Sequence, residues 1–449
     1  MLDKIILNGQ YPDFEHNIMI KKPLGIKDGR LVLLEKEEEA KEIIDAKGAV
    51  VAPGFIDIHM HEERLGDEED IFDVSYHMLH MGVTTTVGGN CGSNRQDIKD
   101  FFERVDREGS PTNYMLLTGH NHFRDKLGIN RYEKATDEEI LKMRELIRKD
   151  LYEEGACGLS FGLAYARGID MREILGITEG LEDVLLTFHA RQDAKGSRDS
   201  VIELIEVAKR TGLPVQMSHM GSNAAMGYME EALELLREAR AEGVDIEADC
   251  YPYAAFSTDI GTSVFDEGCF ENWGKSYEDI LLIQDPYRNV RCDEELFKRV
   301  REEYPDMAVV AFVMNEEEVS MALAEDFVFV ASDGGIEKGQ GHPRSAGTFP
   351  RVLGKYVREE QVLTLIEALK KMSLMPAKRL GLSTKGAIKE GFDADLVIFD
   401  PETVSDRATF TEPTLAPLGI MEVFIAGERA LKDQEILHAR LGRSIRKVY

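Results

Sequence analysis

From residue 54 onward, short apolar runs alternate with longer amphipathic stretches. Continuous apolar runs of this length are typical of strands that are buried on both faces, as in a parallel sheet. The stretches between them repeat apolar residues every three or four positions, which is typical of helices covering such a sheet. The candidate strands are residues 54–61, 83–89, 113–119, 158–161, 184–190, 214–220, 244–253 and 327–334. Eight strands in this rhythm predict an α/β fold, a (β/α)8 TIM-like barrel over residues 54–384.

The helical stretches carry clear start and stop signals. Residues 137–155 begin at Thr136 or Asp137, either of which can cap a helix, and end at Gly155. Residues 201–212 and 229–243 have the same form. The apolar face of the first of these helices consists of Ile140, Met143, Ile147 and Leu151.

Both ends of the chain have a different pattern. Residues 1–53 contain short apolar runs separated by Gly and Asp turn signals, and residues 385–449 return to the same pattern. Strands at the two ends can pair with each other. We therefore expect one small β-sandwich domain built from residues 1–53 and 385–449.

A long stretch with weak periodicity, about residues 254–305, separates the seventh strand from a surplus apolar run at 307–315. Insertions of this length are usually functional, and the loops that follow barrel strands surround the site of a barrel enzyme. The stretch is interpreted as a lid. A loosely packed surface excursion is the alternative.

Composition narrows the classes of function. Of the 449 residues, 43% are hydrophobic and 31% charged, which is a globular balance. The net charge of −29 argues against binding to nucleic acid or to an anionic membrane surface. Five scattered cysteines do not indicate a disulfide framework, and neither a signal peptide nor a membrane span is recognisable. The sequence thus predicts a cytoplasmic protein.

Metal-capable side chains occur at the ends of several predicted strands. His59 and His61 share one face at the end of the first strand, although a pair of polar strand-end residues is the alternative. Cys91 follows the second strand among glycines, where a thiolate suits zinc, but a free cysteine is more often a small buried apolar residue. Further candidates end the fifth, sixth and eighth strands: His189, His219 and Asp333.

The combination is a stronger signal than any single member, because all six residues fall at the same end of their strands. Zinc held by imidazole and thiolate makes hydroxide available near neutral pH and polarises a carbonyl oxygen. A carboxylate beside it can carry a proton to a leaving amine, and Asp333 is the candidate for this role. The pattern predicts metal-assisted hydrolysis, most naturally of an amide.

A second group of residues points to a substrate. Arg344 lies in the loop after the eighth strand, and its planar fork matches a carboxylate, although it could instead pair with one of the many acidic side chains. Tyr251 and Tyr253 follow the seventh strand and can donate to a substrate oxyanion or pack under the lid. Ser257 lies on the same loop.

These motifs resemble the amidohydrolase superfamily, and within it the N-acyl-D-amino-acid deacylases, or D-aminoacylases. The resemblance runs nearly end to end through APGFIDIHMH, GVTTTVGGNCG, EEGACGLSFGLAY, VQMSHMG, DCYPYAAFST and HPRSAGTFPRVLGKYVRE. NCG with GTFPRVLGKYVRE is the specific part, whereas GFIDIHMH occurs across the superfamily.

The resemblance implies a tight zinc site formed by Cys91, His189 and His219. A second, weaker site would be formed by His59, His61 and Asp333. It also implies that Arg344 binds the substrate carboxylate, with Tyr251 and Ser257 as further substrate contacts.

The sequence departs from the family pattern in two places. Gly221 stands where a lysine is expected after the sixth-strand histidine, and Glu62 and Glu63 stand where a shorter aspartate is usual. The fourth strand, GLSF, has no lysine of the kind that bridges two metals in hydantoinases and dihydroorotases, and Cys91 is the natural substitute.

The leading hypothesis is a zinc-dependent enzyme that hydrolyses an N-acyl-D-amino acid, a small molecule with a carboxylate. Hydrolysis of a cyclic or β-linked amide, as in dihydroorotases or isoaspartyl dipeptidases, is the second hypothesis. A non-catalytic scaffold on the same barrel is the third.

Overall fold

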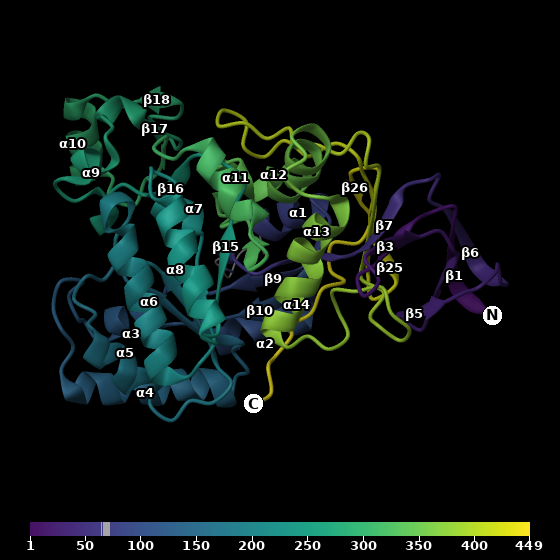
Figure 1. Ribbon diagram of the computed structural model, residues 1–449, viewed down its shortest axis with the longest axis horizontal. Helices are drawn as coiled ribbons and strands as arrows, with labels where there is room; N and C mark the ends of the chain where they lie inside the picture. The colour runs from purple at the N-terminus through teal and green to yellow at the C-terminus, as the bar shows by residue number, and fades with distance from the viewer. Residues whose placement is uncertain (64, 66–71) are drawn as a thin grey trace.

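The computed structural model describes residues 1–63, 65 and 72–449. Within this part of the chain, parallel strands follow one another around a barrel, with helices outside them (Figure 1). All eight predicted strands are present, so the predicted (β/α)8 barrel is confirmed. The barrel strands are β8 (Phe55–Asp57), β9 (Val83–Gly88), β10 (Asn113–Leu116) with β11 (Thr118–Gly119), β12 (Gly158–Gly162), β13 (Leu185–His189), β14 (Val215–Met217), β15 (Ile246–Cys250) and β20 (Val328–Val330).

The barrel closes between its first and last strands. Met60 and Gly334 form a parallel bridge just beyond β8 and β20. The amide of His61 donates to the carbonyl of Gly334 at 2.8 Å, and the amide of Asp333 donates to the carbonyl of His59 at 2.7 Å. Closure therefore brings the segment containing His59 and His61 directly against the one containing Asp333.

Helices α1 (Asp73–His80), α2 (Ile98–Glu108), α3 (His120–Lys126), α4 (Asp137–Tyr152), α5 (Met171–Thr178), α6 (Ser197–Thr211), α8 (Met229–Ala241) and α11 (Glu316–Ala324) surround these strands. α4 begins with a capping box, in which the Glu139 amide donates to Thr136 Oγ1 and the Thr136 amide donates to the Glu139 carboxylate. The predicted apolar positions of α4 are all buried. No described helix is both long enough and apolar enough to cross a membrane.

Two sheets from the chain ends pack together beside the barrel, as predicted for the β-sandwich. One sheet has the order β5 (Arg30–Leu33), β4 (Leu24–Lys27), β1 (Leu2–Leu7) and β6 (Ala40–Asp45). The other has the order β26 (Glu435–Ile436), β25 (Glu428–Lys432), β24 (Ile420–Ile425), β23 (Leu396–Phe399) and β7 (Val50–Pro53). Ile6 and Leu24 of the first sheet and Phe424 of the second belong to one buried core.

The last residues of the chain leave this sandwich. Ser444 pairs with Tyr114 at the start of β10, and the amide of Lys447 donates to the carbonyl of Gly155 at 2.9 Å. Both partners lie at the N-terminal ends of barrel strands, and Figure 1 places the C-terminus there, away from the N-terminus. The final segment therefore pairs with backbone of the barrel. Residues 385–449 do not all belong to the small β domain.

The insertion after β15 is folded, and buried side chains such as Phe265 and Trp273 belong to the same core cluster as the barrel. β16 (Phe256–Asp259), β19 (Ala308–Ala311), β17 (Ile280–Leu282) and β18 (Val290–Arg291) form a sheet, with α9 (Cys269–Trp273) and α10 (Glu294–Glu303) beside it. The surplus apolar run is β19, which pairs with both β16 and β17. Trp273 Nε1 donates to Asp193 Oδ2 at 2.9 Å and ties the insertion to the loop after β13.

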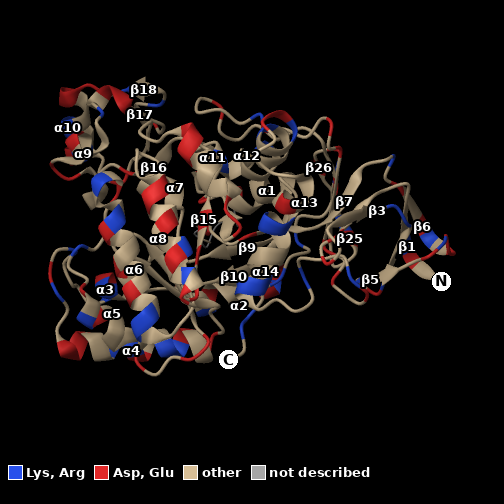
Figure 2. Ribbon diagram, in the orientation of Figure 1, with Lys and Arg blue, Asp and Glu red and all other residues tan. Residues whose placement is uncertain are grey.

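The negative charge is spread over the outer surface. Figure 2 shows Asp and Glu side by side with Lys and Arg on the helices that face away from the barrel, including α4 and α8. Ion pairs such as Lys142 with Glu138 are exposed and contribute little to stability.

Candidate metal centre

The C-terminal ends of the barrel strands carry the predicted metal-capable residues. His59 and His61 follow β8, Cys91 follows β9, His189 is the last residue of β13, and Asp333 follows β20. His219 follows β14. Because parallel strands present their C-terminal ends on one face of a barrel, these residues converge there.

Four of them form one buried cluster. His59, Cys91, His219 and Asp333 each offer a ligand atom, and these atoms all lie within 4.8 Å of one another. Cys91 Sγ lies 3.4 Å from His59 Nε2 and 3.4 Å from His219 Nε2. His59 Nε2 lies 3.5 Å from Asp333 Oδ1.

The other two predicted ligands border this cluster. His61 Nε2 lies 3.0 Å from Asp333 Oδ1. The His189 ring lies with its centroid 4.5 Å from that of His219. The structure thus brings all six predicted residues together.

The backbone at this site is held in an unusual conformation. Cys91, His219 and Asp333 all have positive φ, at 55°, 33° and 49°. Non-glycine residues adopt this region rarely, and each such residue costs about 1–3 kcal/mol, which the surrounding structure must offset. Backbone strain of this kind clusters at functional sites.

The imidazoles of the cluster are oriented by partners on their far sides. His59 Nδ1 lies 3.2 Å from Asp249 Oδ1, which also accepts the backbone amide of His219 at 2.7 Å. His219 Nδ1 lies 2.8 Å from Ser222 Oγ. Such partners fix which ring nitrogen carries a proton and turn Nε2 of both rings toward the cluster.

The electrostatics favour anionic ligands. Burial by itself raises the pKa of the Cys91 thiol, but His59 and His219 bring that pKa well below its usual value. Burial also raises the pKa of Asp333, and Arg344 and His219 bring it well below its usual value. A thiolate, imidazoles and a carboxylate within one small space are the donor set that zinc prefers, so the residues fit this metal.

Arg344 lies directly against the cluster. One of its terminal nitrogens is 2.9 Å from Asp333 Oδ2, and another donates to the carbonyl of Ser257 at 3.2 Å. Its guanidinium stacks on the Tyr251 ring, 4.6 Å from the centroid. The predicted substrate arginine is therefore at the site, and it is held by the insertion and by Tyr251.

The remaining predicted substrate contacts differ in what they do. Tyr251 is fully buried with its hydroxyl 3.8 Å from Met314 Sδ, and Ser257 meets Arg344 through its backbone carbonyl. The hydroxyl of Tyr253 donates to Asp406 at 3.2 Å, and its ring packs under Arg351. This arrangement favours the packing alternative for Tyr253, because its hydroxyl group is hydrogen-bonded to Asp406 and not directed at the cluster.

Comparison with known proteins now identifies the chain. The model of the amidohydrolase family matches residues 50–429. The chain belongs to the amidohydrolase family. The predicted resemblance is thereby confirmed.

Relatives of this amidohydrolase align over nearly its whole length. It is 29% identical to the N-acyl-D-glutamate deacylase of Alcaligenes xylosoxydans xylosoxydans over 99% of this chain and 97% of that protein. It is also 29% identical to the D-aminoacylase of the same organism over 98% of this chain and 97% of that protein.

Solved structures give the same result. The N-acyl-D-glutamate deacylase of Bordetella bronchiseptica, in complex with zinc and a phosphonate inhibitor, superposes with a TM-score of 0.87 at 30% identity over 99% of each chain. A D-aminoacylase structure superposes with a TM-score of 0.88 at 27% identity over 100% of each chain. A D-hydantoinase, at 19% identity and a TM-score of 0.65, shares the fold.

Several residues that support the site were not found from the sequence of this amidohydrolase. Asp249, Ser222 and His342 are all buried or half-buried, and the Arg344 amide donates to His342 Nδ1 at 3.0 Å. Asp249 and His342 do occur in the motifs DCYPYAAFST and HPRSAGTFPRVLGKYVRE, and Asp249 lies in the seventh predicted strand. Their partners, however, come from distant parts of the chain.

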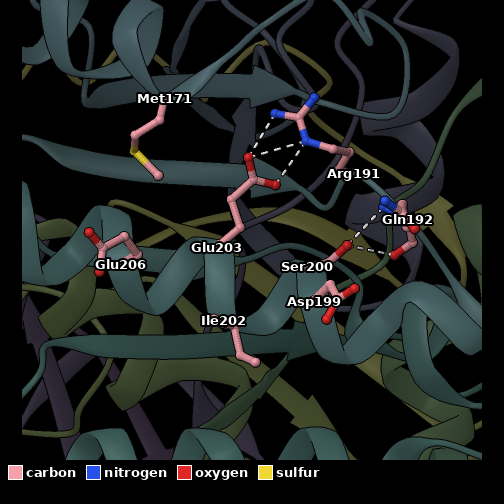
Figure 3. A pocket seen from close by; sticks show the side chains of 8 residues that line it. All are labelled: Met171, Arg191, Gln192, Asp199, Ser200, Ile202, Glu203 and Glu206. Carbon is pink, nitrogen blue, oxygen red and sulfur yellow. Dashed lines mark hydrogen bonds and ion pairs between the residues drawn. The ribbon is translucent and has the colours of Figure 1, made fainter.

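The predicted site does not coincide with the cavity shown in Figure 3. This cavity, of about 550 Å³, lies along α6 and is lined by none of the six candidate ligands. Figure 3 shows the Arg191 guanidinium turned onto the Glu203 carboxylate, with N–O distances of 2.8 to 3.1 Å. The Arg191 guanidinium is therefore already paired with Glu203, and we assign no ligand to this cavity.

Gly221 occupies a crowded position in α7 (Met220–Ala224). A Cβ atom there would lie 3.0 Å from Met314 Cε and 3.1 Å from Cys250 Sγ. We expect Gly221→Lys to lower the free energy of unfolding by about 1–3 kcal/mol, since overpacking displaces buried neighbours. Urea denaturation measures this change.

Ala241→Lys places the same side chain at the exposed end of α8 and serves as the control, with an effect within about 0.5 kcal/mol. Equal stability of the two variants would mean that Met314 and Cys250 leave room for a lysine at position 221.

Proposed function

We propose that this amidohydrolase cleaves the amide bond of an N-acyl-D-amino acid with the help of zinc. The observation that carries the proposal is the buried cluster of His59, Cys91, His219 and Asp333 with Arg344 against its carboxylate. The deacylases to which the chain is similar act, by their names, on substrates of this class.

Zinc would be held most tightly by Cys91, His189 and His219, and more weakly at a second site by His59, His61 and Asp333. The first set supplies a thiolate and two imidazoles, which is typical of a catalytic zinc that keeps an open position. In one D-aminoacylase of known structure, one metal of a binuclear centre activates and a second attenuates, which supports two unequal sites. Bound zinc polarises the acyl carbonyl and lowers the pKa of a water molecule.

The residues of the chain then divide the work. Arg344 binds the substrate carboxylate through its planar guanidinium group, which stacks on the Tyr251 ring. Asp333 accepts the proton of the attacking water on Oδ1, the oxygen that faces His59 and His61, and returns it to the leaving amine. Since Arg344 lies 2.9 Å from Asp333 Oδ2, a substrate whose carboxylate is bound by Arg344 has its reacting amide held close to Asp333.

Other features of the chain support this assignment over the alternatives. β12 carries no lysine that could bridge two metals, which weighs against a cyclic-amide hydrolase. Six convergent candidate ligands weigh against a scaffold. The net charge weighs against nucleic acid as a partner, and five cysteines that are all free support a cytoplasmic location.

The test is a panel of N-acetyl-D- and N-acetyl-L-amino acids with zinc-loaded enzyme. We expect turnover of D-substrates and at least about tenfold lower kcat/KM for the matching L-substrates, because with the carboxylate on Arg344 and the amide at Asp333 the two enantiomers direct their side chains to different parts of the site. Turnover of dihydroorotate or of a β-linked dipeptide without turnover of any D-substrate would support the second hypothesis instead.

A further inference from the structure

Glu62 lies between two segments that carry candidate metal ligands. It directly follows His61, and its side chain is only 2% exposed. Its Oε2 accepts the backbone amide of Gly89 at 2.7 Å, and its Oε1 accepts the backbone amide of Arg95 at 2.9 Å. Both oxygens of the carboxylate are therefore bound by the loop that carries Cys91.

This loop needs support from outside itself. Gly89 and Arg95 lie on either side of Cys91, whose φ of 55° is unfavourable for a residue with a side chain. Close to the cysteine, the Gly92 amide donates to Ser160 Oγ at 3.0 Å and ties the loop to the barrel wall. Glu62 adds a contact at each end of the loop through a single side chain.

The neighbouring strand leaves space for the carboxylate. A Cβ atom on Gly88 would lie only 2.8 Å from Glu62 Oε2 and 2.9 Å from Glu62 Cβ. The absence of a side chain at Gly88 thus allows Glu62 to reach the backbone of the loop. An aspartate at position 62 would be shorter by one methylene group and could not span Gly89 and Arg95 together.

The adjacent residue, Glu63, has a different role although it is also buried. Its carboxylate accepts the amide of Ser75 at 2.7 Å and the hydroxyl of Ser75 at 2.8 Å, and Tyr114 donates to it as well. These partners belong to α1 and β10. Glu63 therefore links α1 to β10. It does not connect the loop of Cys91 to the segment of His59 and His61.

We propose that Glu62 is a positioning residue, which sets Cys91 Sγ against His59 and His219 by tying the cysteine loop to the histidine segment. This inference rests on the metal site in the proposed function. Charge-assisted hydrogen bonds from backbone amides to a buried carboxylate are strong, and outer partners of this kind affect metal affinity by about 10–100-fold.

The experiment compares Glu62→Gln with Glu63→Gln and measures the affinity for zinc and the cobalt–thiolate charge-transfer absorption of the cobalt-loaded protein. A glutamine has one acceptor oxygen and leaves one loop amide without a partner. We expect Glu62→Gln to weaken zinc binding about 10–100-fold and to reduce the charge-transfer band. Glu63→Gln should lower the melting temperature while both metal readouts stay unchanged.

Four outcomes would contradict the proposal. Unchanged zinc affinity and band in Glu62→Gln would make Glu62 a structural residue only, and an equal loss in Glu63→Gln would make the effect general. If wild-type protein shows no cobalt–thiolate band, the proposed metal site itself fails. Should Glu62→Gln not fold, Glu62→Asp must give the same weakening, and unchanged affinity in that variant also overturns the proposal.

Discussion

Replacing Asp333 by asparagine is expected to lower kcat by about 10²–10⁴-fold, the range over which a positioned acid–base group accelerates a reaction. An amide keeps the shape of the carboxylate but cannot accept the proton of the attacking water. Turnover of an N-acetyl-D-amino acid by zinc-loaded Asp333→Asn measures the effect. Metal analysis should still find zinc at the site of Cys91, His189 and His219.

A matched control comes from Asp150, a half-buried carboxylate of α4 whose Oδ2 accepts the hydroxyl of Thr118 at 2.8 Å. Asp150→Asn should leave kcat unchanged, because this carboxylate lies outside the cluster of candidate ligands. Activity of Asp333→Asn close to that of Asp150→Asn would remove Asp333 from the proton-transfer role. The melting temperature of each variant separates lost chemistry from lost folding.

Cys91→Ser is expected to weaken zinc binding by more than about 100-fold, with a parallel loss of turnover at limiting zinc. A serine hydroxyl does not ionise near neutral pH, so the variant loses the anionic sulfur on which His59 and His219 converge. Competition with a chelator of known affinity measures the zinc dissociation constant.

Cys157→Ser is the control for this change. Cys157 is equally buried, but burial raises the pKa of its thiol to about 12 and it lies in the apolar core inside the barrel. We expect its variant to keep full zinc affinity and to show only a change in stability. A Cys91→Ser variant that still purifies with stoichiometric zinc would show that Cys91 is not a ligand.

The candidate site could be predicted from the sequence because strand ends are visible in the apolar pattern. His189, for example, ends a continuous apolar run, and Asp333 follows another, so both fall on the face where barrel strands end. The position of each residue on its own strand was enough, since closure of the barrel brings all these ends together.

The insertion was harder to predict. Residues 254–305 show weak periodicity because short strands, such as β17, alternate with turns and with aromatic side chains that pack against one another. The sheet formed by β16, β17 and β19 depends on pairing across many residues of chain, which local periodicity does not encode.

The contacts that support the candidate ligands could not be predicted either, because they also join residues that are distant along the chain. Asp249 of β15 meets His59, which follows β8, and Glu62 meets Gly89 and Arg95 on the next loop. Asp249 lies in a predicted strand and Glu62 follows the His59–His61 motif, but neither position names a partner, so the role of each carboxylate follows only from the residue that folding brings beside it.

The sequence by itself determined the barrel, the sandwich made from both chain ends and the six side chains at the strand ends. These features follow from periodicity and residue type, which are local properties of the chain. Only the tertiary structure decided that Arg344 pairs with Asp333, that the C-terminal segment lies against the barrel, that Met314 and Cys250 close off the space at Gly221 and that Glu62 holds the loop of Cys91. Those contacts join residues far apart along the chain, and they form only when the barrel closes and packs.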